Sequence, residues 1–514
     1  MNRGSILIPY GLLAVGLTVL FAPKETGARS ASLLVGNGES PQTVRRPGAG
    51  QFMTLSANRT HLVSTFTNKP VFITGDTAYN LIVQLSSVAD VEAFLSDRQA
   101  KGMNLIWVGL VDATNHGEGS NDRATTENDA FGNSPWNGGP TFTGMSEATA
   151  YWAHVDDVLQ RAAAHGITVL AGTGFTTSFA RCNLPYASSM TASSDATMTT
   201  YGAFLGRRYK YYPNIIWLQG GDANVKLCGT SLAEKVSDIA KGILTEDVGH
   251  LIAVEATSNV WGEPSATNWS PYSFGSSNPG GWLTVGTIYP KGTPADTFSA
   301  EIAQIISQNV TETRATPYVP YFNMEDPYEF EPFKRPYNTQ QLRQEGYTEI
   351  LSGAYLGRLF GSGGIWPFGA GCCTHGPTWQ TNIKDPTSFD QMRLGQLFRS
   401  REHWELVADV DHKVLTAGYG EGATLTTTSR TRDGQSIIAY IPNGDAATLT
   451  VDMSKITSVL NLATCWWFSP SSGATTLIGN YSNSGMRDFT APDVNDWVLV
   501  IDDASANLPA PGSP

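Results

Sequence analysis

The stretch YPNIIWLQGGDAN, residues 212–224, combines a short apolar run, two glycines and an acid. An uninterrupted apolar run with β-branched residues is typical of a strand in a parallel sheet that is buried on both faces. Gly220 and Gly221 allow a tight turn after the run and leave room for a ligand. Asp222 follows them directly. The pattern therefore predicts a buried strand that ends on a carboxylate.

A second stretch of the same kind, YVPYFNME at residues 318–325, follows about a hundred residues later and ends on Glu325. Two buried strands that each end on an acid suggest two carboxylates facing one cleft. Glycoside hydrolysis uses such a pair of carboxyl groups.

Strand and helix patterns alternate across the first four-fifths of the chain. Strands are predicted at 71–74, 105–111, 167–171, 215–220, 251–254, 283–288, 318–323 and 364–368, and helices at 88–101, 146–165, 196–212, 231–246, 298–313 and 339–352. Ser87 is suited to cap the helix at 88–101, and Gly102 to end it. Eight repeats over roughly 340 residues predict an α/β fold, the (β/α)8 or TIM barrel. A doubly wound sheet is the alternative.

The pattern changes near Asp409 to short alternating strands separated by turns. They are predicted at 414–415, 424–428, 436–441, 447–451, 463–468 and 496–501. This spacing is typical of an all-β sandwich. The predicted organisation is an export signal at 1–30, a linker at 31–50, the catalytic barrel at 51–408, the β-sandwich at 409–505 and a disordered, proline-rich tail at 506–514.

The first 30 residues resemble an export signal. Arg3 precedes an apolar segment at 6–21, and the small residues Ala28 and Ser30 offer a cleavage site. We therefore expect a secreted or periplasmic protein with no stable membrane partner. An uncleaved membrane anchor is the alternative, although the apolar segment is short for a bilayer.

The composition excludes several classes of function. With 41% hydrophobic and 15% charged residues the chain is globular, and its formal charge of −13 argues against a nucleic-acid partner. A neutral polysaccharide or oligosaccharide fits this surface better. The eight histidines are scattered and no C-x-x-C or H-E-x-x-H occurs, so we expect no metal and no cofactor.

Five cysteines in an exported chain leave one without a partner. Cys182 and Cys228 both follow predicted barrel strands, so a disulfide between them and two free thiols remain alternatives. Cys372 and Cys373 are adjacent, and Cys465 lies in the second domain.

In a barrel of this type the catalytic groups lie at the carboxyl ends of the strands. We predict Glu325 as the nucleophile and Asp222 as the acid/base, because a retaining glycosidase needs two carboxyl groups about 5–5.5 Å apart. Asp222 could instead cap a turn, and Glu329 is the rival of Glu325. The predicted substrate-binding residues are Asp76, Tyr79, Asp112, Glu255, Trp261, Tyr289, Glu329 and Trp366. For the acids a structural loop role is the alternative, and for the aromatic residues a place in the core.

The motifs FITGDTAYNL at 72–81, FLSDRQAKGMN at 94–104, WLQGGD at 217–222 and NMEDPYE at 323–329 resemble the apiosidase-like glycoside hydrolases. The resemblance implies a (β/α)8 retaining hydrolase that acts on pectic or related polysaccharides. It also implies an Asp acid/base and a Glu nucleophile, roles that fall on Asp222 and Glu325.

The segments WFSPSSG at 467–473 and DWVLV at 496–500 resemble the sandwich named as a collagen-binding domain that often follows this barrel. We expect it to act as a rigid flanking domain. Tyr79 stands where a Trp is usual, and the loops at 113–145 and 256–282 are particular to this chain, so apiose specificity is not carried over.

The sequence therefore predicts a secreted retaining glycoside hydrolase that cleaves a plant-type or microbial polysaccharide. The alternative is a non-catalytic carbohydrate- or matrix-binding protein built on the same barrel. A serine hydrolase is disfavoured because no G-x-S-x-G occurs.

Overall fold

The structure is a computed structural model of the chain. It describes residues 52–111, 128–137, 149–174, 190–223, 230–256, 282–288, 319–325, 327–330, 337–368, 378–445 and 447–513. Residues 222, 223, 230–233 and 256 are described by their backbone alone.

Eight parallel strands form the first domain, in the sheet order β8-β7-β6-β5-β4-β11-β10-β9. They are β4 (Ile73–Thr77), β5 (Leu105–Gly109), β6 (Thr168–Gly172), β7 (Ile215–Ala223), β8 (Leu251–Ala256), β9 (Gly286–Ile288), β10 (Tyr321–Asn323) and β11 (Gly357–Phe360). The backbone N–H groups of Thr284 and Val285, just before β9, donate to the Ile252 carbonyl of β8 at 2.9 and 3.2 Å. The sheet is therefore a nearly closed barrel, and the prediction of a TIM-like fold is confirmed.

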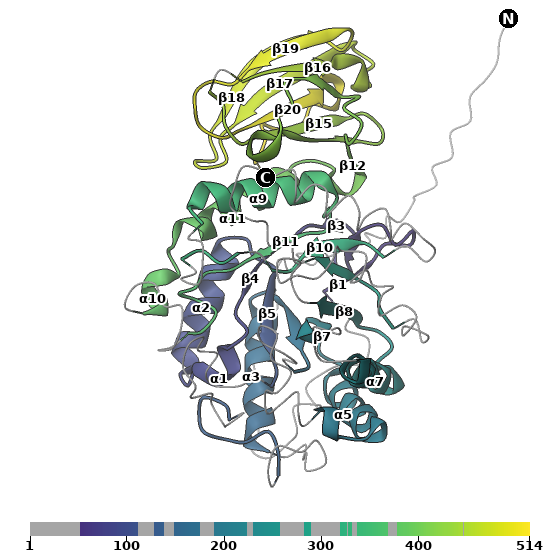
Figure 1. Cartoon of the computed structure of the whole chain (residues 1–514), viewed down its shortest axis with the longest axis vertical. Coiled ribbons are helices and arrows are strands. Elements are labelled where there is room, and N and C mark those ends of the chain that lie inside the picture. The colour runs from purple at the N-terminus through teal and green to yellow at the C-terminus, as the bar shows by residue number, and fades with distance from the viewer. Residues whose placement is uncertain are drawn as a thin grey trace, which may run out of the picture. The chain divides into compact units, whose positions relative to one another are not determined.

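Helices lie outside the barrel strands (Figure 1). Those described are α1 (Leu81–Gln84), α2 (Val88–Ala100), α3 (Ala150–Ala164), α5 (Asp195–Tyr209), α7 (Thr230–Glu246), α9 (Thr339–Ser352), α10 (Trp379–Asn382) and α11 (Pro386–Arg399). Ser87 caps α2 by accepting a hydrogen bond from the Asp90 N–H, as the sequence predicts. The predicted helix at 298–313 lies outside the described residues. No helix in the described part of the chain is both long and apolar enough to cross a bilayer.

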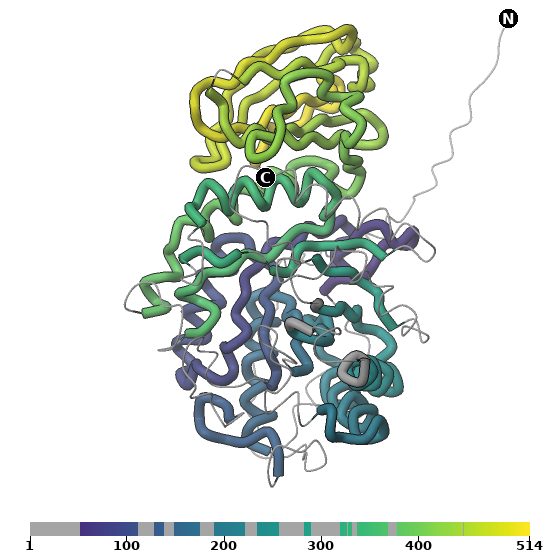
Figure 2. The backbone as a smooth tube through the Cα atoms, in the orientation of Figure 1, coloured from purple at the N-terminus to yellow at the C-terminus, as the bar shows by residue number. Residues whose placement is uncertain are grey.

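Helices α5 and α7 lie side by side (Figure 2). Glycines make this close approach possible, because a Cβ atom at Gly202 would overlap the Ile239 carbonyl and one at Gly242 would overlap the Thr199 carbonyl. The pair covers the sheet beside β7, the strand that carries Asp222.

The eighth strand is β11 at Gly357–Phe360, not residues 364–368 as predicted. Arg358 interrupts the apolar run and hides the strand from a hydropathy pattern. In the structure this arginine is buried, with its Nε atom 3.4 Å from Glu349 of α9. Trp366 therefore lies in the turns that follow the strand, not on it.

Alternate residues of the strands point into the barrel and form one apolar cluster, here called the interior cluster. Its strand residues are Ile73, Leu105, Trp107, Leu170, Ile216, Leu218, Leu251, Ala253, Phe322 and Leu359. The residues between them, such as Ile106 and Trp217, pack in a second cluster with the helices. This alternation is the period-2 pattern of strands buried on both faces.

A small antiparallel sheet precedes the barrel, formed by β1 (Met53–Leu55), β2 (Leu62–Ser64) and β3 (Pro70–Val71). Leu62 pairs with Val71, so β2 and β3 form a hairpin. Met53 and Leu62 join the interior cluster beside Ile216 and Leu251, which lie near the starts of their strands. The hairpin therefore covers the end of the barrel where strands begin, and the opposite end holds the carboxyl edges.

The second domain consists of two antiparallel sheets. The larger contains β12 (Leu406–Ala408), β14 (Thr427–Thr431), β15 (Ser436–Ile441), β20 (Trp497–Asp503), β17 (Leu462–Phe468) and β18 (Thr475–Ser482), and the smaller β13 (Leu415–Ala417), β16 (Thr448–Asp452) and β19 (Met486–Thr490). Short 3₁₀ helices are η5 (His403–Glu405), η6 (Gly422–Thr424), η7 (Met453–Lys455) and η8 (Ala504–Ala506). Ile437, Leu449 and Phe489 belong to the core between the sheets. The predicted all-β domain is confirmed.

Helix α9 contacts both domains. Arg343 of α9 holds the Asp496 carboxylate through two hydrogen bonds of 2.8 and 3.0 Å. Tyr347 stacks on Tyr440 of β15, with ring centroids 4.8 Å apart and planes 2° from parallel. These buried contacts join the sandwich to the barrel helix as part of one core.

The C-terminal residues 506–513, expected to be a disordered tail, lie against the end of α11 in the structure. The Gly512 N–H donates to the Ser400 hydroxyl at 3.0 Å, and the Arg401 guanidinium donates to the Pro509 carbonyl at 3.0 Å. A proline-rich composition hides these contacts because they depend on partners about a hundred residues away.

Candidate active site

The two predicted catalytic acids lie at the ends of two strands of the same barrel. Asp222 lies near the end of β7, where Gly220 and Gly221 have positive φ angles of 93° and 109°. These angles favour glycine, and they interrupt the pairing of β7 with β8 between Gly220 and Ala223. Glu325 comes two residues after β10.

Both acids belong to the carboxyl edge of the barrel. In the nearly closed sheet, β8 and β9 separate β7 from β10. All barrel strands are parallel, so their carboxyl ends meet at one mouth. The distance between the two carboxyl groups stays a prediction, since only the backbone of Asp222 is described.

Glu325 is held close to the end of its strand. Its backbone N–H donates to the Asn323 side-chain oxygen at 3.0 Å, and the residue is 5% exposed. Phe322 and Met324 on either side of Asn323 belong to the interior cluster. The residue predicted as the nucleophile is therefore buried, and a local turn fixes its backbone at the barrel mouth.

Glu255 is a second acid beside the end of β7. It follows the alternation of Leu251 and Ala253, which point into the barrel. Its Cα is the register partner of Gly220, and its side chain is fully buried. Gly220 precedes Asp222 by two residues, so Glu255 lies beside the end of β7 that carries Asp222. The predicted contact of Glu255 with substrate stays a prediction.

Four aromatic rings gather at the same end of the interior cluster. The ring centroid of Tyr79 lies 4.8 Å from that of Trp107 and 4.8 Å from that of Trp366. The ring planes of Tyr79 and Trp366 are stacked, at 25° to each other. The centroid of Tyr328 lies 6.3 Å from that of Trp366. Tyr79 and Trp366 are predicted binding residues, whereas Trp107 and Tyr328 are new. Flat aromatic faces can stack on sugar rings, so the group forms a candidate platform.

Asp76 faces away from this platform. Its carboxylate accepts a 2.7 Å hydrogen bond from Arg98 of α2, and both side chains are fully buried. Burial raises the pKa of Asp76 to about 6, against the lowering effect of Arg98. The pair ties α2 to β4, and the predicted sugar contact of Asp76 stays a prediction.

Glu329 faces the first turn of α11. Both of its carboxyl oxygens accept the Thr387 N–H, at 3.2 and 3.3 Å, and its backbone pairs with the strand extension at Ser362. Burial raises the pKa of Glu329 to about 7, Thr387 lowers it, and Asp385 raises it further. Since its carboxyl group holds a helix N-terminus, Glu325 is the stronger candidate for the nucleophile.

The predicted binding residues Asp112, Trp261 and Tyr289 lie outside the described residues, as do Cys182 and Cys228. Cys465 is a buried free thiol of the sandwich.

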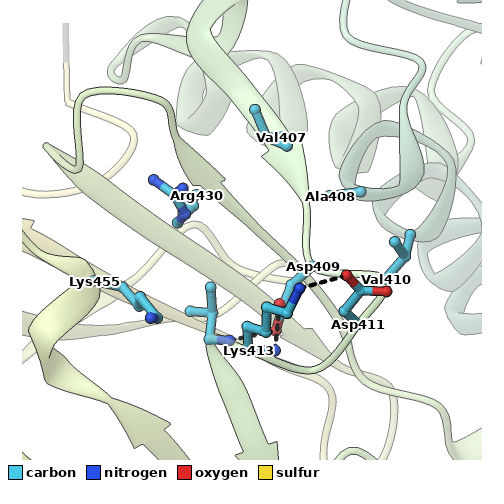
Figure 3. Close-up of a pocket in the computed structure, with 9 residues that line it drawn as sticks. Val407, Ala408, Asp409, Val410, Asp411, Lys413, Arg430 and Lys455 are labelled. Carbon is cyan, nitrogen blue, oxygen red and sulfur yellow. Dashed lines mark hydrogen bonds and ion pairs between the residues drawn. The ribbon is translucent and has the colours of Figure 1, made fainter.

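A small cavity of about 180 Å³ lies in the sandwich, and none of the predicted site residues lines it (Figure 3). Asp409 accepts the backbone N–H groups of Lys413, Val414 and Leu415, while the Lys413 ammonium pairs with Asp411 at 2.8 Å. The charged side chains of Asp409, Asp411 and Lys413 therefore make these contacts within the loop itself.

Comparisons with known proteins agree with this fold and these motifs. Residues 56–405 match the family model described as "Apiosidase-like, catalytic domain". The chain belongs to this apiosidase-like family. Residues 411–502 match the model described as "Putative collagen-binding domain of a collagenase". The resemblance inferred from the sequence motifs is thus confirmed for both domains.

Two solved structures share the fold of this apiosidase-like chain. One is a glycoside hydrolase with 20% identity and a TM-score of 0.71, covering 88% of this chain and 97% of its own. The other is a glycoside hydrolase family 5 protein from Bacteroides vulgatus ATCC 8482, with 21% identity and a TM-score of 0.71, covering 88% and 93%. No curated protein matches the chain in sequence.

Proposed function

We propose that the chain is a secreted retaining glycoside hydrolase that cleaves a plant-type or microbial polysaccharide. The observation that carries the proposal is the position of Asp222 near the end of β7 and of Glu325 just after β10, at the carboxyl edge of an apiosidase-like barrel. A pair of acids at the carboxyl edge is the arrangement that double displacement requires.

In the proposed mechanism Glu325 attacks the anomeric carbon while Asp222 donates its proton to the leaving glycosidic oxygen. The sugar is then bound to Glu325 as an ester. Asp222 next removes a proton from water, the water oxygen bonds to the anomeric carbon, and the bond to Glu325 breaks. The product keeps the anomeric configuration of the substrate.

Other features support a sugar substrate. The rings of Tyr79, Trp107, Tyr328 and Trp366 are buried together at the barrel mouth, and aromatic rings in such a place can stack on a sugar. The formal charge of −13 suits a neutral glycan better than a polyanion. The apolar segment at 6–21 after Arg3 supports export to the periplasm or beyond, where polysaccharides are met.

The test is turnover by the full chain on pectic, arabinan and bacterial exopolysaccharide fractions, with analysis of the products and their anomeric configuration. Asp222→Asn and Glu325→Gln should each lower the rate by at least about a hundredfold with the fold intact. The control is Asp247→Asn, which alters a buried carboxylate just before β8, at the opposite end of the barrel. Full activity in both site variants would exclude the assignment. Glycan binding without product would favour the carbohydrate- or matrix-binding alternative.

A further inference from the structure

The cavity of the sandwich lies where the loop between β12 and β13 meets β14 and η7. Its charged lining consists of the cations Lys413, Arg430 and Lys455 and the acids Asp409 and Asp411. All five belong to the second domain, and the proposed reaction uses none of them. The cavity therefore has to be interpreted from its own chemistry.

The two acids of the lining are matched within the loop. Both carboxylate oxygens of Asp409 accept backbone N–H groups of residues 413–415, at 2.8–2.9 Å. The Asp411 carboxylate lies 2.8 Å from the Lys413 ammonium. The two other cations of the lining are therefore left without an acid among the residues around the cavity.

Arg430 presents an unused edge of its guanidinium group. It lies opposite Val407 of β12 and opposite Ile437 of β15. Opposite residues share a face of the sheet, and Ile437 belongs to the core of the sandwich, so Arg430 leaves the inner face. Its Nη1 atom donates to the carbonyl oxygens of Thr431 and Arg432, at 3.1 and 3.4 Å. Its Nε and Nη2 atoms have no hydrogen-bond partner among the described residues, and this pair of donors matches a carboxylate.

Lys455 provides a second cation at the end of η7. Its ammonium lies 3.4 Å from the Asp452 carboxylate, in a pair whose side chains are both partly exposed. Asp452 also accepts the backbone N–H and the hydroxyl of Ser454. Partly exposed pairs of this kind are weak, so the ammonium can turn to another anion at little cost. In Figure 3, Arg430 and Lys455 lie on the side of the cavity away from Asp411.

The rest of the lining is apolar and the space is small. Val407, Val410 and Val414 line the cavity, and the Val410 side chain is 63% exposed. Its volume of about 180 Å³ is below the roughly 300–1,000 Å³ of sites for drug-sized ligands, so it suits a single ring. A sugar ring can place its C–H groups against the valines. A carboxylate on the same ring can then reach the free edge of Arg430.

We propose that this cavity binds a uronate, a sugar ring that carries a carboxylate, with Arg430 as the main contact and Lys455 as the second cation. The inference rests on the proposed function, because a barrel that cleaves a polysaccharide meets such rings as units of a glycan. The formal charge of −13 does not oppose it, since salt screens exposed charges beyond about 8 Å and only one carboxylate enters the cavity.

The test is calorimetric titration of the full chain with D-galacturonate and with D-galactose, which has a hydroxymethyl group in place of the carboxylate. Neither has a glycosidic bond to cleave, so binding is measured whatever the barrel does. We expect galacturonate to bind at least about tenfold more tightly than galactose, and Arg430→Gln to raise the Kd of galacturonate about tenfold or more. Lys455→Gln should raise it about two- to fivefold. Arg432→Gln is the matched control, because it removes the same charge from an arginine that pairs with Glu405 and does not line the cavity.

Equal Kd values for the two sugars would overturn the proposal, as would the same change in Kd in the Arg430→Gln and Arg432→Gln variants. Displacement of galacturonate by an equal concentration of sulfate would also overturn it, because the cavity would then accept any anion. If Arg430→Gln fails to fold, Arg430→Lys replaces it and should also weaken binding, since it keeps the charge and loses the paired donors. Galacturonate binding without cleavage of any glycan fraction would contradict the proposed function and leave this site standing.

Discussion

The carboxylate of Asp76 on β4 accepts a 2.7 Å hydrogen bond from Arg98 on α2, and neither side chain is exposed. A buried ion pair of this kind contributes to stability only while both partners are present, because the loss of one leaves an uncompensated charge.

Arg98→Met should lower the free energy of unfolding by about 3–5 kcal/mol, as expected when one partner of a buried pair is removed. The double variant Arg98→Met/Asp76→Asn should lose less, because no buried carboxylate is left alone. Urea unfolding measures both. A double variant no more stable than the single one would show that the uncompensated charge of Asp76 does not cause the loss of stability. An unchanged KM in the double variant would show that Asp76 does not bind substrate.

Glu329 should make stability depend on pH. Its pKa is raised from 4.5 to about 7 in the folded protein, so the folded state binds the proton more tightly than the unfolded state. The stability is therefore full below about pH 4.5 and falls as the pH rises towards 7, by roughly 3 kcal/mol for a shift of this size.

The measurement is chemical unfolding of the wild type and Glu329→Gln at pH 5 and pH 8. Gln cannot ionise, so the variant should lose less stability than the wild type between these values. Parallel pH curves for the two proteins would refute this role of Glu329.

Trp366→Ala should weaken substrate binding if the aromatic group is a sugar platform. A stacking contact worth roughly 1 kcal/mol corresponds to about a fivefold rise in KM. The control is Trp379→Ala, because Trp379 is equally buried but packs with Phe94 and Phe368 in the helix-side cluster. The measurement is the KM of both variants on the glycan fraction that the wild type cleaves. An equal rise in KM in both variants would mean that only packing is disturbed.

The barrel and the sandwich should unfold in one transition, because α9 is buried between them. Arg343→Met removes the partner of the buried Asp496 carboxylate and should cost about 3–5 kcal/mol of the whole transition. Arg432→Met breaks the partly exposed pair with Glu405 and should cost about 1 kcal/mol or less. Calorimetry is the measurement. Two separate transitions, with one unaffected by Arg343→Met, would contradict this coupling.

Apolar runs and helix caps made much of the fold predictable from sequence. The predicted helix at 339–352 has the bounds of α9, and the predicted strand at 436–441 has those of β15. Both have strong local signals: Asn338 and Gly353 flank the helix, and the strand is a continuous apolar run.

The errors come from elements whose stability depends on distant partners. Strand β11 contains Arg358, whose burial depends on α9, and β18 alternates weakly because none of its residues is fully buried. Helix α11 was not predicted, although Pro386 at its start is a helix signal.

For the candidate site, the sequence predicted which acids lie near strand ends better than it predicted the directions in which their side chains point. Asp76 shares its face of β4 with Thr74, while Ile73 points into the barrel, so strict alternation would have placed Asp76 on the helix side. The inward direction of Trp107 could have been predicted in the same way, because it lies two residues after Leu105 on the same face of β5. The contact of Glu329 with α11 could not, because it joins residues 58 apart in the chain.

The bonds that hold Pro509 and Gly512 against Arg401 and Ser400 have a practical consequence for making the protein. An affinity tag fused directly after Ser513 would start beside an anchored segment. A spacer of several flexible residues would let the resin capture the tag without pulling this segment away.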